Sequence, residues 1–280
     1  SSKYYFFANQ ESLFENKNFV NLYLEAETKF VFKNYLFLLG KISGHPFHKN
    51  DYYEARTGDF NTIVKKSKYL RLSAYSSSDF RKKFALDLGG GIQTNPLYQG
   101  YEYSWRVSPR YRFNNKFSTK YVLSVKNKFN DIGYSNNLNG FPVIAIRNTN
   151  MITNVLSGSY IINNKMDFSF KLRYHIDQVK NLSYHSVNND GYLDLNNFLL
   201  NLDENENYTT WTSDVSWNWW YSPGSQISIV WKNGRDFSDD NINYNWIDNA
   251  NQTLNSSKQN SISFKIVYYL DYLYLRNDKN

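Results

Sequence analysis

Residues 103–129 most constrain the fold, because apolar and polar side chains alternate along two arms that an Asn-Asn pair separates. On the first arm, Trp105 and Val107 lie between Ser and Arg residues, and the second arm repeats the pattern with Ser and Lys. A period of two is typical of a β-strand, since successive side chains point to opposite faces. The segment therefore predicts a β-hairpin with one aromatic face and one cationic face.

The same unit recurs along the 280 residues and predicts a single all-β domain over residues 1–280. We expect twelve antiparallel strands, at 3–13, 19–32, 35–43, 68–77, 83–93, 103–113, 117–129, 150–162, 166–176, 208–221, 226–232 and 259–274. Short polar turns rich in Asn, Gly, Pro and Ser are expected at 33–34, 77–79, 114–115, 163–165 and 222–225. Longer loops are expected at 44–67, 94–102, 130–149, 177–207 and 233–258. No helical period and no Pro/Ser-rich linker is found.

Strands of about ten residues with an apolar and a polar face are long enough to cross a bilayer within a barrel. Aromatic residues make up 19% of the chain, with 25 Tyr, which suits a protein that meets two membrane interfaces. A soluble β-sandwich also alternates polar and apolar residues, but its strands have only about five or six residues. We therefore expect a transmembrane up-and-down β-barrel of about twelve strands, with short periplasmic turns and long extracellular loops.

Hydropathy agrees with strands rather than helices as the membrane-crossing element. The mean hydropathy is −0.65, and no run approaches the 18 apolar residues of a transmembrane helix. The start at Ser1 carries no signal peptide, and because a barrel must be exported we expect a mature or truncated chain. The absence of cysteine leaves the redox compartment open. The expected location is the bacterial outer membrane, with its lipid and lipopolysaccharide as partners.

The basic residues fall on alternate strand positions. The net charge is +7, which would raise nucleic acid as a partner, but no helical basic stripe is present. We predict a lumen-facing basic stripe made of Arg71, Arg106, Arg110, Arg112, Lys120, Lys126, Lys128, Lys171, Arg173 and Lys265. Fewer acids, among them Asp87, Asp167 and Asp214, share that face. Such a lumen favours anionic solutes or glycans, and internal salt bridges that fill a narrow barrel remain the alternative.

Aromatic residues crowd the strand at 208–221 and its turn. We predict an interfacial aromatic girdle of Trp105, Trp211, Trp217, Trp219, Tyr221, Tyr268 and Tyr272, because amphipathic rings settle at membrane–water interfaces. A sugar-stacking platform is the alternative if Trp220 points inward.

Four local strings carry a family resemblance: residues 48–56 (HKNDYYEAR), 78–88 (SDFRKKFALDL), 153–160 (TNVLSGSY) and 221–233 (YSPGSQISIVWKN). They resemble the carboxy-terminal barrel of a Bacteroidota outer-membrane family of unknown function, over roughly residues 40 to 275. Members typically carry an amino-terminal sandwich similar to family-9 carbohydrate-binding modules, which this chain lacks. The resemblance implies fold and location rather than activity, and is compatible with a chain that is the carboxy-terminal part of a longer polypeptide.

Motifs for catalysis or metal binding are weak. His45 and His48, with Asp51 and Glu54, have metal-ligand chemistry, but Pro46 prevents a helix that would present both imidazoles together. The loop at 186–197 matches a calcium loop only in part, and Asp239-Asp240 is weaker still. The triple glycine at 89–91 is expected to form a bulge or bend in a strand, and no nucleophile motif is present. We expect no cofactor, no metal and no enzymatic activity.

Two functions remain open. The first is a pore, or a transport- or glycan-related barrel with a basic lumen. The second is a non-catalytic structural or accessory subunit of a larger outer-membrane complex, in contact with other outer-membrane proteins, because the long Asn- and Tyr-rich loops carry no catalytic set.

Overall fold

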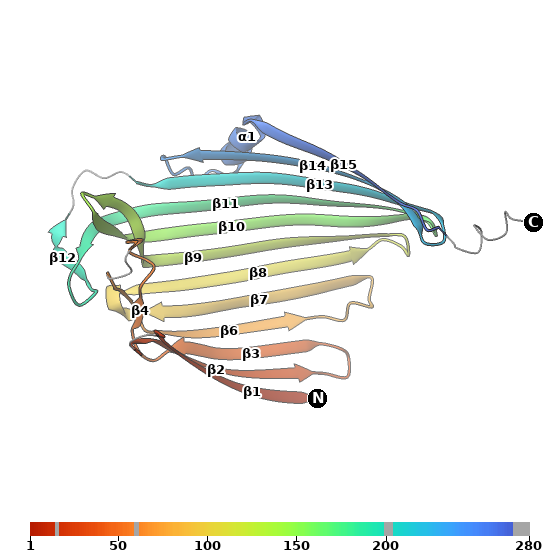
Figure 1. The fold of residues 1–280 in the computed structure, drawn as a ribbon. Helices are drawn as coiled ribbons and strands as arrows, with labels where there is room; N and C mark the ends of the chain where they lie inside the picture. The colour runs from red at the N-terminus through yellow and green to blue at the C-terminus, as the bar shows by residue number, and fades with distance from the viewer. Residues whose placement is uncertain (15–16, 59–61, 199–203, 271–280) are drawn as a thin grey trace, which may run out of the picture.

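The computed structural model describes residues 1–14, 17–58, 62–198 and 204–270, which form an antiparallel all-β fold (Figure 1). Twelve strands pair in chain order to form one sheet: β1 (Ser2–Ser12), β2 (Phe19–Val31), β3 (Phe37–His45), β6 (Tyr69–Ser77), β7 (Phe84–Asn95), β8 (Gly100–Arg112), β9 (Phe117–Leu138), β10 (Phe141–Asn163), β11 (Met166–Val187), β13 (Glu206–Ser222), β14 (Ser225–Asp239) and β15 (Lys258–Val267). A thirteenth strand, β12 (Leu193–Phe198), pairs with β11, while β4 (Lys49–Asp51) and β5 (Val64–Lys66) form a separate hairpin. The twelve predicted strands correspond to the twelve of this path.

Asparagine side chains close the short turns at one end of the sheet. The Asn114 side-chain carbonyl accepts the backbone N–H groups of Lys116 and Phe117, each at 2.8 Å. Asn163 accepts the N–H of Lys165 at 2.8 Å in the same way. These side chains replace backbone partners and so fix the reversal of the chain. The predicted short turns therefore lie together, at the right-hand end of Figure 1.

Two predicted long loops at the other end are wrong. Residues 130–149 continue β9 and β10, which turn at Asn139 and Gly140 with positive φ values of 52° and 88°. Strand pairing therefore reaches well past the positions where the alternation becomes irregular, at register shifts near Asn130 and Asn148. Residues 94–102 are also compact, because a single 3-10 turn, η1 (Pro96–Tyr98), joins β7 to β8.

The sheet has two chemically different faces. Because the register is continuous across most strand pairs, the alternating side chains of neighbouring strands line up on a shared face. One face is apolar and aromatic, and many of its large side chains are exposed; they include Phe6, Ile42, Leu72, Ile92, Trp105, Tyr121, Leu156, Trp231, Ile262 and Phe264. The opposite face carries hydroxyls, amides and charged groups.

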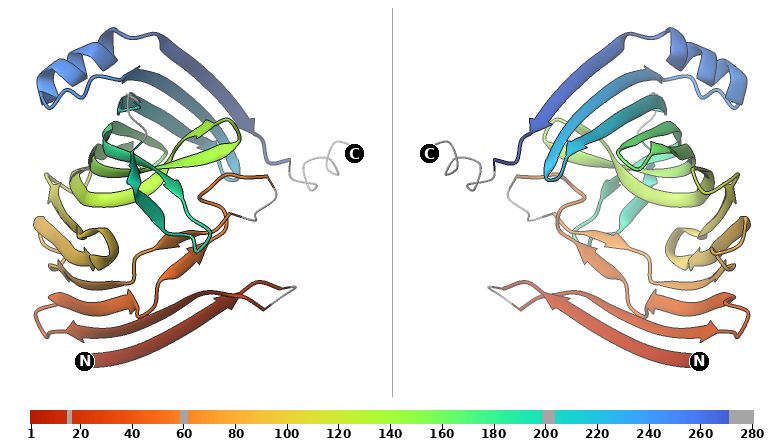
Figure 2. Two further views of the ribbon diagram at one scale, coloured as in Figure 1. Left: turned by 90° about the vertical axis from the view of Figure 1, so that its left-hand side faces the viewer. Right: turned by 90° about the vertical axis from the view of Figure 1, so that its right-hand side faces the viewer.

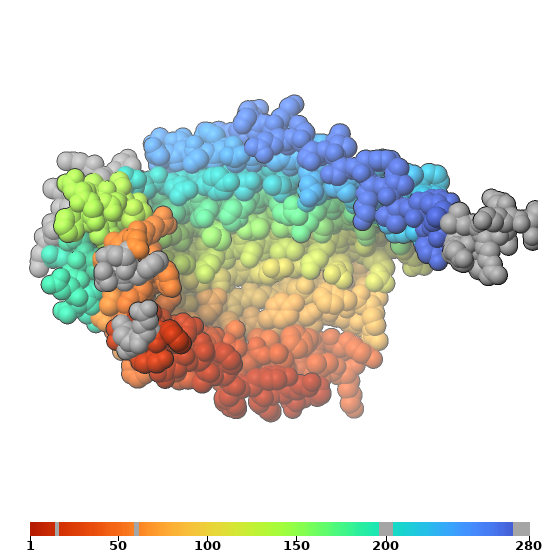
Figure 3. Space-filling view, viewed as in Figure 1, coloured from red at the N-terminus to blue at the C-terminus, as the bar shows by residue number. Residues whose placement is uncertain are grey.

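The sheet is strongly curved (Figure 2). Its polar face is the concave one, because residues of that face, among them Gln93 and Glu102, line a hollow together with Lys49 and Lys66 of the β4–β5 hairpin. Figure 3 looks into the hollow between the amino-terminal and carboxy-terminal strands. Among the described residues, β1 pairs only with β2 and β15 only with β14. The expected closed barrel is therefore not what the described chain forms: strand 258–267 does not pair with strand 2–12, and the sheet is open.

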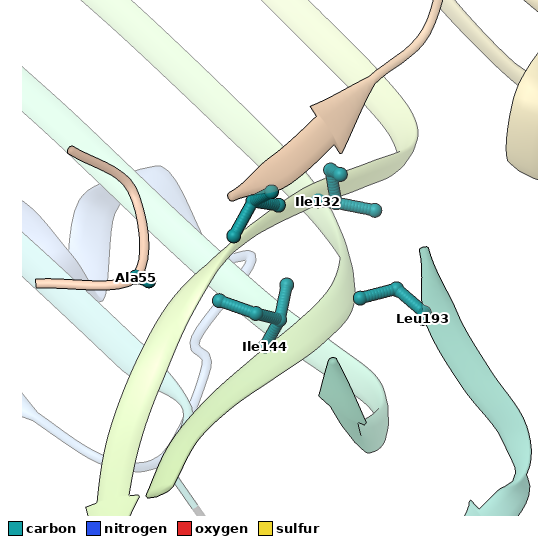
Figure 4. Close-up of a cluster of buried hydrophobic side chains, with 5 residues drawn as sticks. Ala55, Ile132, Ile144 and Leu193 are labelled. Carbon is teal, nitrogen blue, oxygen red and sulfur yellow. The ribbon is translucent and has the colours of Figure 1, made fainter. Parts of the chain in front are cut away.

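Segments from the loop end fold into the concave side (Figure 2). There Ala55, Val64 and Leu193 pack against Ile132 and Ile144 of the sheet, and all five are at most 6% exposed (Figure 4). Backbone bonds also tie the hairpin to the loop before β12, since the Lys65 N–H donates to the Gly191 carbonyl at 2.8 Å. This small core fixes the loops against β9 and β10.

A helix that the sequence pattern did not predict lies between β14 and β15. α1 (Trp246–Asn255) begins at Asn245, whose side chain accepts the N–H groups of Ile247 and Asp248, as an N-cap does. It packs on the convex face of β13, where Thr253 meets Thr209 at 2.6 Å between hydroxyl oxygens and Asn249 accepts from Asn207 at 3.0 Å. Among the described residues, no helix is both long and apolar enough to cross a membrane.

Candidate functional site: the charged concave face

The predicted basic stripe lies on one face of the sheet. Strand pairing places all ten side chains on the concave side: Arg71, Arg106, Arg110, Arg112, Lys120, Lys126, Lys128, Lys171, Arg173 and Lys265. They extend from β6 to β15, across almost the whole width of the sheet. The face is therefore a broad positively charged surface rather than a local patch.

Near the loop end of this surface, at the start of β8, lies an acid that was not predicted from the sequence. Glu102 is only 4% exposed and forms ion pairs with Arg71 and with Lys126, the latter at 3.2 Å. Arg71 also donates to the Ser104 hydroxyl at 2.9 Å. Glu102 stands directly before the predicted start of its strand, at residue 103. The alternation, extended by one residue, would have placed it on the cationic face.

The glycines of β7 make room for these side chains. Strand pairing runs without a shift through residues 89–91, so no bulge forms there. A Cβ on Gly91 would lie 3.2 Å from the guanidinium of Arg71, and one on Gly89 would lie 3.2 Å from the Tyr75 ring. Glycine at these two positions lets the Arg71 and Tyr75 side chains lie close against the backbone of β7 on the concave face.

Three other cations of the stripe have acidic partners of their own. Arg173 pairs with Asp214 at 2.8 Å, Lys128 with Asp131 at 2.8 Å, and Lys120 with Asp87 at 3.9 Å. The third predicted acid, Asp167, instead accepts a hydrogen bond from Asn218. The structure thus places all three predicted acids on the concave face beside the basic stripe.

Several cations have no acidic partner within the described part of the chain. Arg106, Lys171 and Lys265 have no carboxylate within 4 Å there, while Arg110 lies over the Phe80 ring at 4.6 Å. Arg110, Lys120 and Lys171 border a hollow of about 390 Å³ that also contains Asp214 and serines of four strands. The concave face therefore retains an excess of positive charge together with many hydroxyl groups.

A second hollow, of about 260 Å³, lies between the sheet and the β4–β5 hairpin. Its lining includes His45 and Lys128 from the sheet and Lys49 and Lys66 from the hairpin. The hairpin is held by Glu54, which accepts the Tyr134 N–H at 2.8 Å and forms an ion pair with Lys66. The hollow is thus bounded by the sheet on one side and by the β4–β5 hairpin on the other.

Asp51 is the charged anchor of this hairpin. Burial alone would raise the pKa of its carboxyl, but Lys66 and Lys49, at 3.6 and 3.4 Å, and the N–H groups of Tyr53 and Glu54 outweigh it. The pKa of Asp51 therefore lies below its ordinary value of 3.8.

We expect the hairpin to stay docked at neutral and mildly acidic pH and to be released only in strong acid. Because the folded-state pKa is depressed, the stabilisation from Asp51 is complete above pH 3.8 and is lost as pH falls through the folded-state value. Hydrogen exchange of residues 49–66 as a function of pH measures this. Asp51→Asn should speed exchange at neutral pH and flatten the acid response; an unchanged response would contradict the role of Asp51.

The residues considered for metal binding are not brought together. The His45 ring packs at a tilt between the rings of Tyr23 and Tyr69, with ring centroids 5.6 and 4.9 Å apart. His48 Nδ1 accepts the N–H of Lys68 at 3.2 Å, and the two acids are engaged with lysines. No cluster of three or more potential ligands occurs within the described ranges.

The partial calcium loop at 186–197 is a hydrogen-bonded turn. Asn188 accepts the N–H groups of Asp190 and Tyr192, each at 3.0 Å. Gly191 completes the turn with a φ of +87°, a conformation that favours glycine. The second weak candidate, Asp239, accepts the N–H of Asn241 at 3.0 Å and so closes another turn.

The girdle residues Trp105, Trp211, Trp217 and Trp219 lie on the convex face of their strands but at different heights. Trp217, Trp219 and Tyr221 contact one another near the short turn, with centroids 6.2 and 5.7 Å apart. Trp211 lies eight residues away at the other end of the apolar stretch, where its ring is 6.0 Å from Tyr174. Trp211 therefore does not share the level of the three rings near the short turn.

The remaining girdle residues differ in position. Trp105 is 40% exposed on the convex face of β8, and Tyr268 is 67% exposed just after β15. Tyr272 lies outside the described residues. Trp220, considered as a sugar platform, is 42% exposed next to the short turn of β13.

The profile of a family described as "Domain of unknown function (DUF5916)" matches residues 1–279. No curated protein matches the chain.

Proposed function

We propose that this chain, which belongs to the DUF5916 family of domains of unknown function, forms the wall of a bacterial outer-membrane β-barrel whose basic inner face guides anionic solutes or glycans. The observation that carries the proposal is the pair of opposite faces. The convex side exposes large apolar and aromatic side chains over the whole sheet, while the charges gather on the concave side. In water, an exposed apolar surface of this size would promote aggregation. A membrane barrel has this arrangement, with apolar side chains toward the lipid and polar groups inside.

The height of the apolar surface supports this. On β11, convex-face residues from Met166 to Ile176 are apolar, and polar residues begin at Gln178. Ten steps at about 3.4 Å give roughly 34 Å along the strand. A strand tilted by about 45° would then cross roughly 25 Å, the height of the apolar band of outer-membrane barrels.

α1 and its surroundings fit the outer rim of that band. The helix covers the polar convex-face residues Gln178, Asn207 and Thr209, each at most 3% exposed. Its own Trp246 and Ile247 remain exposed, at 42% and 71%. An amphipathic helix with an aromatic anchor suits the plane of the lipid headgroups.

The proposal has one structural requirement. Unpaired backbone N–H and C=O groups cost several kcal/mol each in hydrocarbon, so a membrane barrel has no free strand edge. The edges of β1 and β15 must then be covered in the bilayer by further strands. The covering strands would come from the same polypeptide or from a partner.

Cysteine labelling tests the proposal, and the chain has no cysteine of its own to interfere. Leu123 and Ser124 are adjacent on β9 and point to the convex and the concave face respectively. With Leu123→Cys in native outer membranes, we expect reaction with a lipid-soluble maleimide only. With Ser124→Cys, a small water-soluble maleimide should react. Equal reaction of both residues with the water-soluble reagent would reject a lipid-facing convex side.

A structural or accessory subunit is the second candidate, and a specific observation favours it. Ion pairs such as Arg71–Glu102 occupy the concave face, and inward-folded loops lie at one end. A lumen filled in this way would conduct poorly. Planar-bilayer recordings of the purified full-length protein separate the two: anion-selective steps support a path for solutes, and a silent bilayer supports the accessory role.

A further inference from the structure

The hollow beneath the β4–β5 hairpin differs from the rest of the concave face because it is bounded on two sides. The sheet contributes Lys128 and Arg147 to its lining, and the hairpin contributes Lys49 and Lys66. Side-chain amides of Gln93 and Asn95 also line it. Its volume of about 260 Å³ suits a molecule the size of a single sugar ring and a few waters.

Arg147 is the cation in this hollow without an acidic partner among the described residues. Its guanidinium donates to the Tyr134 carbonyl at 3.4 Å, and its Nε is buried without a hydrogen-bond partner. An arginine with an unused donor costs free energy unless a ligand or water takes the hydrogen bond. A guanidinium also presents a planar pair of donors that matches a carboxylate or phosphate.

The lack of a side chain at Gly133 leaves the space in which this guanidinium lies. A Cβ at residue 133 would collide with the guanidinium group of Arg147. The backbone at Gly133 has no positive φ, so a turn is not the reason for glycine at this position. The space left by Gly133 therefore determines where the Arg147 guanidinium lies.

The two acids that line the hollow are already neutralised. Glu102 pairs with Arg71 and Lys126, and Asp131 pairs with Lys128. When the ion-pair partners of these groups are included, six cations (Lys49, Lys66, Arg71, Lys126, Lys128 and Arg147) stand against four acids (Asp51, Glu54, Glu102 and Asp131). An incoming anion therefore meets a net positive environment that is partly shielded from water.

We propose that this hollow binds a small hydroxylated oxyanion, the chemistry shared by sugar acids and sugar phosphates. Arg147 takes the oxyanion, and the amides of Gln93 and Asn95 take hydroxyl groups. The inference rests on the proposed function in one respect, since the ligand reaches the hollow along the inside of the barrel.

Calorimetric titration of the detergent-solubilised full-length protein tests the proposal with four probes: glucuronate, glucose 6-phosphate, glucose and inorganic phosphate. We expect at least one anionic sugar to bind at least tenfold more tightly than glucose and than phosphate. Which of the two binds identifies the source, carboxylate or phosphate ester. No binding by either anionic sugar, or equal binding of glucose or of phosphate, would overturn the proposal.

Three variants localise the binding. Arg147→Gln removes the cation, and Gly133→Ala keeps the cation but displaces its guanidinium; each should weaken binding at least tenfold. Arg81→Gln is the matched control, because it removes an exposed arginine from the turn between β6 and β7, outside both the hollow and the basic stripe, and should bind like the wild type. Wild-type affinity in Arg147→Gln and in Gly133→Ala would place the ligand elsewhere. The two proposals can fail separately: absence of binding in the titration would reject the oxyanion site alone, and equal labelling of residues 123 and 124 would reject the membrane barrel alone.

Discussion

Val125→Arg should destabilise the protein in lipid by about 2–4 kcal/mol, the cost of a cation in the middle of a barrel's apolar band. Val125 lies on the convex face of β9, between Trp105 of β8 and Ile152 of β10. These neighbours are apolar, so no group there compensates the charge. Urea titration of the protein in phospholipid vesicles, followed by tryptophan fluorescence, gives the free energy of unfolding.

Val122→Arg is the matched control, since it makes the same change three residues away. Val122 pairs with Val155 and faces the concave side. An arginine there joins a surface that is already charged and hydrated, so the free energy of unfolding should change by less than about 1 kcal/mol. If both variants behave alike, or if Val125→Arg is neutral, the convex face does not meet lipid.

Glu102→Gln should lower the free energy of unfolding by about 2–3 kcal/mol and weaken the packing of Arg71 and Lys126 at the loop end of the concave face. The change leaves Arg71 and Lys126 without their shared acid, and removal of one member of a buried ion pair costs about 3–5 kcal/mol. The two cations are 25% and 41% exposed, so water recovers part of that cost. The free energy of unfolding is the measurement.

An exposed ion pair of the same kind gives the comparison. Arg81 holds the pKa of Asp79 at about 2 in the turn between β6 and β7. The Arg81 side chain is 63% exposed, and an asparagine at residue 79 can still accept the Arg81 N–H, so Asp79→Asn should have little effect on the free energy of unfolding. Adding Arg71→Met to Glu102→Gln should recover stability, since one unpaired cation is removed. A cost for Glu102→Gln no larger than that for Asp79→Asn would mean that Glu102 does not organise the face.

The strands and the two faces were predictable because they depend on a local property. A period of two in side-chain polarity is readable within ten residues, and it also placed Arg106, Lys126 and Lys171 on one surface. The missed Glu102 shows the limit of this reasoning. A strand boundary set one residue late removed the acid that pairs with two of the predicted cations.

Closure and loop structure depend on contacts between distant residues, which alternation does not encode. Whether β1 meets β15 depends on the accumulated twist and curvature of the whole sheet. Ala55 and Val64 are isolated apolar residues in a polar loop, and only the structure shows that they pack on Ile144. α1 escaped detection because the residues it buries, Asn249 and Thr253, are polar and match polar groups on β13.

The order of strands in the sheet has a consequence for the way the protein folds. Every neighbour along the sheet is also a neighbour in sequence, apart from the inserted β4–β5 hairpin and β12. Chain closure is therefore short at each step, and such local topologies fold quickly. The hairpin joins residues far apart, as in the bond between Glu54 and Tyr134, 80 positions away. We expect its docking to be the last and slowest event, which follows assembly of the wall it rests on.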